Sequence, residues 1–185
     1  MFVKDQTLFV SPIQEDCFEE IKQYAEEALK KADAVGDDED VSTREEYKME
    51  IPRKFEAWIA ELIDLYFDRH TFMKGFYGLD NKNLKISSIW VNRMLKGDQH
   101  KPHSHKECLY AFVVYVKTTD NDAGFCWMTH DGLGGIDICT IDIDEVSMGH
   151  VMIFPADLPH TVYPKMTDPE RISVSGNICC YADPE

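Results

Sequence analysis

Residues 97–107 read GDQHKPHSHKE and are followed by the apolar stretch LYAFVVYVKT at 109–118. Three histidines, His100, His103 and His105, lie close together in the first of these segments. Side chains alternate along an extended chain, so His103 and His105 project to the same side, and imidazoles readily bind divalent metals. We therefore expect a His-x-His metal-binding pair here. The competing interpretation is a His-rich polar loop that lies in solvent.

The segments around this stretch indicate a mainly β fold. Short runs rich in Val, Ile, Tyr and Trp alternate with turn signals such as DNDAG at 120–124 and DGLGG at 131–135. This spacing is typical of a sandwich or jelly roll rather than of a parallel α/β sheet. The expected strands span residues 84–95, 109–118, 124–130, 136–146, 149–154, 160–163 and 171–180.

Two helices are predicted before these strands. The sequence SPIQ at 11–14 offers a capping hydroxyl, a proline suited to the first helical position and a glutamine three residues after the cap. Apolar residues then recur every three or four positions to about Ala32. Pro52 can open a second helix, whose apolar stripe runs from Phe55 to Tyr66. We expect both helices to cover the outer face of the sheet.

The length of 185 residues fits one domain with a sizeable core. No internal repeat or linker marks a second domain. The predicted organisation is therefore a single domain over 1–185, with 1–83 as a helical support region and 84–185 as a jelly-roll core.

A third candidate ligand follows a second apolar run. The sequence GHVMIFPADLPH at 149–160 places His160 after a strand and a Pro-containing turn, where it can complete a facial set with His103 and His105. An alternative ligand set uses His105 and Glu107, which also lie two positions apart, with His160 as the third member. We rank this alternative second.

The segment ERISVSGN at 170–177 carries a lone arginine on the polar face of an alternating strand. Arg171 shares that face with Ser173 and Asn177. A guanidinium eleven positions after the candidate ligand His160 is well placed to bind a carboxylate of a metal-bound cosubstrate. The alternative is a surface strand with an ordinary salt bridge.

Aromatic and polar residues on two strands could also line the site. Tyr110 and Tyr115 follow the His-x-His pair and could donate a hydrogen bond to a cosubstrate carboxylate, although aromatic residues in a β core more often serve packing. Trp90 and Asn92 alternate with apolar neighbours and could line the same cavity.

The charge and cysteine content narrow the function classes. A formal net charge of −15 opposes binding to nucleic acids, and no basic cluster offsets it. The N-terminal residues lack the apolar stretch of a signal peptide or membrane span, and the six cysteines form no CxxC pair or disulfide framework. We expect a cytoplasmic protein that acts on a small-molecule or peptide substrate, with no nucleic-acid or membrane partner.

Together, these motifs resemble the 2-oxoglutarate/Fe(II) oxygenases common in phages and marine bacteria. The resemblance rests on WVN at 90–92, PHSH at 102–105, the strand 111–116, FPADLPH at 154–160 and ERIS through Asn177. It implies a double-stranded β-helix, Fe(II) and 2-oxoglutarate, an oxygenase activity that is by default a hydroxylation, and an Arg171-x-Ser173 clamp for the distal carboxylate. It also implies His103 and His160 as iron ligands, whereas His105 stands where the superfamily most often has a carboxylate.

The same residues also resemble the cupins. Gly97 precedes His103, and Gly149 precedes Pro155 and His160, at the spacings of the two cupin motifs. The alternatives to the oxygenase are therefore a cupin-type metal-dependent dioxygenase or isomerase, and a jelly-roll module that binds metal without turnover. The Arg171-x-Ser173 pair favours the oxygenase.

Overall fold

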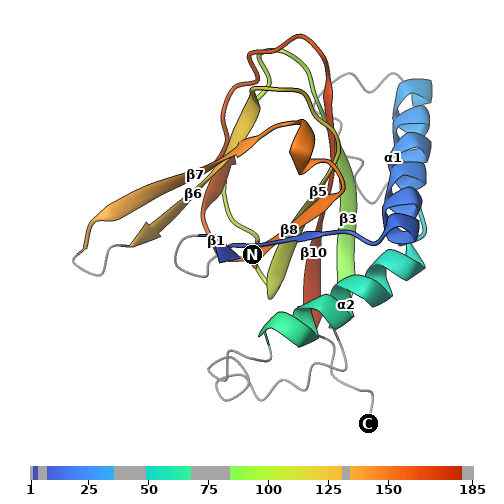
Figure 1. Cartoon of the computed structure of the whole chain (residues 1–185), viewed down its shortest axis with the longest axis horizontal. Helices are drawn as coiled ribbons and strands as arrows, with labels where there is room; N and C mark the ends of the chain where they lie inside the picture. The colour runs from blue at the N-terminus through green and yellow to red at the C-terminus, as the bar shows by residue number, and fades with distance from the viewer. Residues whose placement is uncertain (1, 4–7, 36–48, 68–83, 131–133, 181–185) are drawn as a thin grey trace.

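Two antiparallel β-sheets face each other, and two helices pack on the outside of the larger sheet (Figure 1). The computed structural model describes residues 2–3, 8–35, 49–67, 84–130 and 134–180. The elements are β1 (Phe2–Val3), β2 (Leu8–Pro12), α1 (Glu15–Val35), α2 (Arg53–Phe67), β3 (Leu84–Met94), β4 (His100–His103), β5 (Tyr110–Lys117), β6 (Asp122–His130), β7 (Ile136–Ile143), the short 3-10 helix η3 (Glu145–Ser147), β8 (His150–Pro155), β9 (His160–Val162) and β10 (Arg171–Cys180). This is the jelly-roll architecture that the sequence predicts.

The two sheets hold the strands that carry the candidate site. The larger sheet has the order β1-β2-β8-β5-β10-β3, and the smaller has the order β4-β9-β6-β7. Strand β10 lies between β3 and β5 and pairs with both along most of its length. The polar residues of β10 are therefore held on a strand that is hydrogen-bonded on both sides.

The core has two layers, one on each face of the larger sheet. Phe112 and Val114 of β5 pack toward the helices, whereas Val113 and Tyr115 pack toward the smaller sheet. This division follows from the alternation of side chains along a strand. Residues of β4, β5, β9 and β10 line one cavity in the space between the two sheets.

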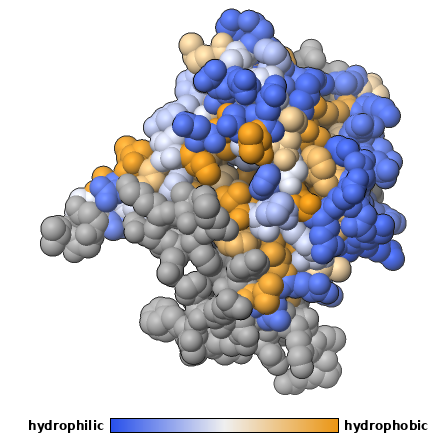
Figure 2. Space-filling view, in the orientation of Figure 1, coloured by the Kyte–Doolittle hydropathy of each residue, from blue (hydrophilic) through white to orange (hydrophobic). Residues whose placement is uncertain are grey.

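The helices bury the faces that the sequence predicts. The buried residues of α1 are Cys17, Ile21, Tyr24, Ala25, Ala28 and Ala32, and those of α2 are Phe55, Ile59, Leu62 and Ile63. The outward face of α1 is hydrophilic in the space-filling view (Figure 2). Within the described ranges, no helix is long and apolar enough to cross a membrane.

The predicted start of the first helix is wrong. Ser11 and Pro12 end strand β2, where they pair with Val151 and His150 of β8, and the helix begins only at Glu15. Proline disfavours the helical conformation of the residue before it, so Ser11 is readily extended. The region 1–83 therefore adds two strands, β1 and β2, to the larger sheet as well as the helices. The second helix begins at Arg53, directly after Pro52, as expected.

All seven predicted strands are present, and two further differences stand out. The strand expected over 136–146 ends at Ile143, where the chain turns into η3. Strand β4, which contains Pro102 and two histidines, was not predicted. It exists because His100 and His103 pair with Val162 and His160 of β9, a partner far away in the sequence.

Candidate metal centre and cosubstrate pocket

The structure brings the three predicted histidine ligands together between the sheets. The pairing of β4 with β9 places His103 directly opposite His160. His105 follows two residues after the end of β4, and its backbone N–H donates to the carbonyl of Ala156 at 2.7 Å. One ring nitrogen from each of the three imidazoles lies within 4.8 Å of the other two. This spacing lets the three side chains converge on one divalent ion.

Each imidazole uses Nδ1 for a hydrogen bond to a neighbouring oxygen. His103 Nδ1 donates to the carbonyl of Lys101 at 2.7 Å, and His160 Nδ1 donates to the carbonyl of Leu158 at 2.9 Å. His105 Nδ1 donates to the side-chain oxygen of Asn177. Since these partners can only accept, the proton sits on Nδ1 and the lone pair of Nε2 is free. Metal-ligating histidines are oriented in this way.

Burial favours the neutral form of two of the rings. Burial lowers the pKa of His160 to about 4, and the other histidines nearby act in the same direction. Burial also lowers the pKa of His105, against an opposing contribution from the hydrogen bond to Asn177. Metal binding requires deprotonated imidazole, so both rings are in the ligating form at neutral pH.

Arg171 lies in the same cavity as the histidines and is only 2% exposed. Its Nη1 donates to the carbonyl of Ala123 at 2.6 Å, and its Nη2 contacts the thioether sulfur of Met94 at 2.7 Å. Its Nε has no hydrogen-bond partner among the described residues. A thioether is a weak acceptor, so the Nε/Nη2 edge of the guanidinium lacks an oxygen partner. A carboxylate can bind such an edge through two hydrogen bonds.

Other predicted residues surround this cavity. Trp90, Asn92, Tyr115 and Ser173 all line it. Trp90 also stacks on His105, with ring centroids 5.7 Å apart. Asn177, on the same strand as Arg171, is not among the residues that line the cavity, but its side-chain oxygen contacts His105, which does line it.

Two candidates from the sequence lie elsewhere. Tyr110 packs in the core layer that faces the helices, because the five-residue interval from Tyr115 places it on the opposite face of β5. Glu107 is exposed, with a φ of 66°, and it does not belong to the cluster that could hold a metal among the described residues. The structure therefore favours the ligand set of three histidines over the set with Glu107.

Three residues at or near the cavity were not assigned to the site from the sequence. His100 lines the cavity from β4, although it was not among the predicted ligands. Lys165 and Asp122 form a buried ion pair beside Arg171. Asp122 was part of a turn signal in the sequence, and nothing local marks Lys165 as buried.

Comparisons with known proteins give a family match for the part of the chain that contains this cavity. Residues 88–177 match the model of a family described as "Putative 2OG-Fe(II) oxygenase", where 2OG is 2-oxoglutarate. This span contains every residue of the cavity described above. No curated protein sequence matches the chain.

Several solved structures share the fold. AviO1 from Streptomyces viridochromogenes Tue57 has a TM-score of 0.66 at 10% identity, over 97% of this chain and 92% of that one. A Pseudomonas putida prolyl-4-hydroxylase has a TM-score of 0.58 at 16% identity, over 95% and 94%. HygX from Streptomyces hygroscopicus, with nickel and 2-oxoglutarate bound, has a TM-score of 0.56 at 13% identity, over 94% and 83%. A match to an oxidoreductase of the 2OG-Fe(II) oxygenase family from Burkholderia pseudomallei is partial and spans 51% of that chain.

Residues 88–177 of the chain are therefore similar to the 2OG-Fe(II) oxygenase family. Its residues fit the two groups that this family uses. Three imidazoles with free Nε2 lone pairs suit Fe(II), and a buried arginine with an unpartnered Nε suits a carboxylate.

Proposed function

We propose that the chain is an Fe(II)- and 2-oxoglutarate-dependent hydroxylase of a small-molecule or peptide substrate. In this proposal His103, His105 and His160 bind the iron, and Arg171 with Ser173 binds the distal carboxylate of 2-oxoglutarate. The observation that carries the proposal is the presence of the histidine cluster and Arg171 in one cavity. One of the similar folds is a prolyl-4-hydroxylase, which is consistent with hydroxylation as the outcome.

The iron and the cosubstrate, when bound, supply the oxidising chemistry: 2-oxoglutarate is decarboxylated to succinate, and one oxygen atom of dioxygen is transferred to the substrate. The residues of the chain bind and orient the metal and the cosubstrate. The imidazoles of His103, His105 and His160 would hold the metal, which would supply binding positions for the 2-oxo acid. Arg171 fixes the far end of the cosubstrate, so that its 2-oxo acid end meets the metal in one orientation.

Apolar side chains protect this end of the cavity from water. Phe125 and Phe154 line the cavity beside His160, with ring centroids 5.4 Å and 4.8 Å from its imidazole. Both rings are almost fully buried. Their role is to exclude water from the reacting centre and to strengthen electrostatic contacts within it.

The ligand set also affects the metal. Three neutral imidazoles bring one negative charge fewer than a set of two histidines and a carboxylate. The iron should therefore have an altered redox potential, and discrimination against zinc should be weaker. A cupin-type dioxygenase or isomerase, or a module that binds metal without turnover, could use the same three histidines without a cosubstrate.

An anaerobic titration separates these functions. Fe(II)-loaded protein is titrated with 2-oxoglutarate while the weak visible charge-transfer band of the chelated cosubstrate is followed. We expect a band in the wild type that His160→Ala abolishes and Arg171→Ala weakens. His130→Ala is the matched control, because His130 is an exposed histidine of β6 outside the cluster. If the wild type binds iron but shows no band and no affinity for 2-oxoglutarate, the proposal fails and one of the two alternatives takes its place.

A further inference from the structure

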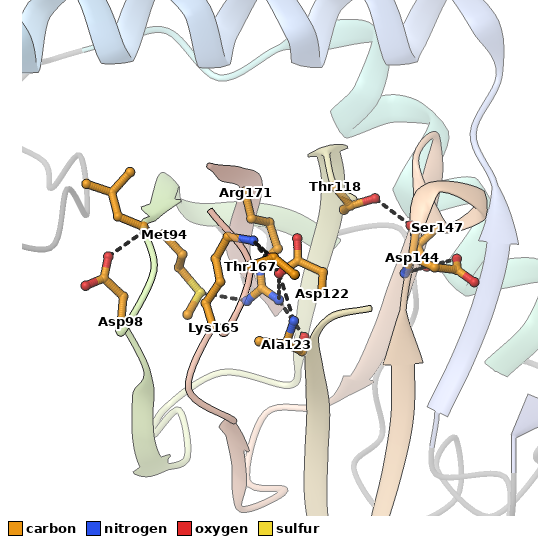
Figure 3. Close-up of polar contacts among 11 residues, drawn as sticks. Met94, Asp98, Thr118, Asp122, Ala123, Asp144, Ser147, Lys165, Thr167 and Arg171 are labelled. Carbon is orange, nitrogen blue, oxygen red and sulfur yellow. Dashed lines mark hydrogen bonds and ion pairs between the residues drawn. The ribbon is translucent and has the colours of Figure 1, made fainter. Parts of the chain in front are cut away.

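A buried cluster of charges surrounds the guanidinium of Arg171 (Figure 3). Lys165 Nζ lies 2.9 Å from Asp122 Oδ1, and Arg171 Nη1 lies 3.9 Å from the same oxygen. The side chains of Lys165 and Asp122 are 0% exposed, and that of Arg171 is 2% exposed. Lysine, aspartate and arginine are rarely buried to this extent unless they are paired.

The cluster has one positive charge in excess. Among the residues that the structure describes, it contains two cations and one anion, and its other polar contacts are with neutral groups. Thr167 Oγ1 accepts from Lys165 Nζ at 2.6 Å. The ring of Tyr115 lies 5.7 Å from the guanidinium carbon, and burial raises the pKa of this phenol to about 12. An uncompensated charge in a buried site is costly, so the cluster favours a ligand that brings one negative charge.

The single carboxylate of the cluster is held by Lys165 rather than by Arg171. Asp122 Oδ1 accepts from Lys165 Nζ at 2.9 Å and from the backbone N–H of Ala123 at 2.8 Å. The backbone of Lys165 is itself fixed, because its N–H donates to the carbonyl of Asp98 at 2.9 Å and its carbonyl accepts from Gly97 at 2.8 Å. At 3.9 Å from Nη1, Asp122 is beyond hydrogen-bond distance of Arg171.

We propose that Lys165 and Asp122 are positioning residues that keep the pocket of Arg171 at a net charge of plus one, and so make it selective for a 2-oxo acid with a second, distal carboxylate. This inference rests on the proposed function. Lys165 forms the ion pair with Asp122, so that Asp122 does not neutralise Arg171. The positive charge of Arg171 is then available to the cosubstrate. Without the lysine, Asp122 would serve as the counter-ion of Arg171 and would repel an entering carboxylate.

Charge-changing variants at the two positions test the proposal. Lys165→Met leaves a net charge of zero, Asp122→Asn leaves plus two, and the double variant returns to plus one. The probes are 2-oxoglutarate and 2-oxopentanoate, which has the same carbon chain but no distal carboxylate. Binding is measured by calorimetry on Ni(II)-loaded protein, which holds the oxo acid without turnover, and the affinity for Ni(II) itself is measured alongside.

We expect Lys165→Met to weaken 2-oxoglutarate binding on the order of ten- to a hundred-fold, the effect of one charge a few ångströms away in a partly screened site. The affinities for 2-oxopentanoate and for Ni(II) should not change. The double variant should recover most of the affinity for 2-oxoglutarate, which a purely structural role of Lys165 would not produce.

The proposal is overturned if Lys165→Met binds 2-oxoglutarate like the wild type, or if the double variant is as weak as Lys165→Met. If Lys165→Met does not fold, Asp122→Asn, with a net charge of plus two, is compared with the double variant, with plus one. The proposal then requires Asp122→Asn to bind 2-oxoglutarate more tightly than the double variant does. Equal affinity in that comparison contradicts it. If the wild type binds neither oxo acid, the proposed function itself has failed, and this result is distinguishable from the others.

Discussion

The side-chain oxygen of Asn177 accepts a hydrogen bond from Nδ1 of His105. The same amide donates from Nδ2 to Ser88 Oγ at 3.0 Å, which fixes the orientation of its oxygen. Asn177 lies on β10 and His105 lies after β4, so this bond joins a strand of the larger sheet to a candidate metal ligand. It holds the imidazole of His105 within the histidine cluster and leaves Nε2 as the ring nitrogen with the lone pair.

Asn177→Ala should therefore weaken metal binding. Loss of the acceptor frees the ring of His105 to rotate and to change tautomer, and the loss of such a partner typically lowers metal affinity about 10- to 100-fold. Asn177→Asp, which keeps the acceptor, should retain tight binding. Isothermal titration with Co(II) or Fe(II) measures the affinities. The matched control is Asn92→Ala, since the Asn92 amide donates to Ser175 and not to a histidine. Equal losses in both alanine variants would contradict the role of Asn177.

The two ligand sets make opposite predictions for Glu107. Because Glu107 is exposed and outside the histidine cluster, Glu107→Gln should bind Fe(II) like the wild type. His103→Ala should lose most of the affinity, since it removes one of three ligands. The measurement is a metal titration of both variants under anaerobic conditions. A large loss in Glu107→Gln with a small loss in His103→Ala would establish the alternative set.

The metal-free protein should lose stability as the pH falls from 6.5 to 4. Burial lowers the pKa of His160 from 6.5 to about 4, so in this window the unfolded state binds a proton that the folded state does not. The free energy of unfolding therefore rises with pH, by at most about 3 kcal/mol for this group. Urea unfolding in the presence of a chelator measures it. Many carboxylates also titrate, so the test is the difference from His160→Gln, whose pH dependence should be flatter. An identical slope would show that His160 is not a buried neutral imidazole.

The packing around β10 predicts a strong effect of a small substitution. A Cβ added at Gly176 would lie 2.5 Å from the ring of Phe112 and 2.6 Å from the carbonyl oxygen of Ser88. Gly176→Ala should lower the free energy of unfolding by about 1 to 3 kcal/mol or more, because the core has no room for the methyl group. Chemical denaturation measures the loss. Adding Phe112→Leu should restore part of it, and strictly additive losses in the double variant would argue against this contact.

Much of the fold could be predicted from the sequence because its signals are local. The β-rich runs and the turns between them located seven strands, and the apolar periodicity located the buried faces of both helices. Three strands were missed: β1, which pairs with β2, and two strands that depend on partners far away in the chain. Strand β2 pairs with β8, and β4 pairs with β9, although β4 contains a proline and has little β propensity of its own.

The candidate site likewise contains residues that the sequence could predict and residues that it could not. The spacing of His103, His105 and His160 and the lone Arg171 could be found from motifs. Tyr110 was misplaced, although the odd interval from Tyr115 already implied the opposite face of the strand. The pairing of Lys165 with Asp122 could not be found, because the two residues lie on a loop and a strand that only the folded chain brings together.

The most direct test of the account is a crystal structure of the Fe(II)-loaded protein, grown without oxygen in the presence of 2-oxoglutarate and measured at the iron absorption edge. We expect one anomalous peak about 2 Å from Nε2 of each of His103, His105 and His160. We also expect the distal carboxylate of 2-oxoglutarate to contact Arg171. A peak bound by Glu107, or iron in place with the cosubstrate remote from Arg171, would contradict the account.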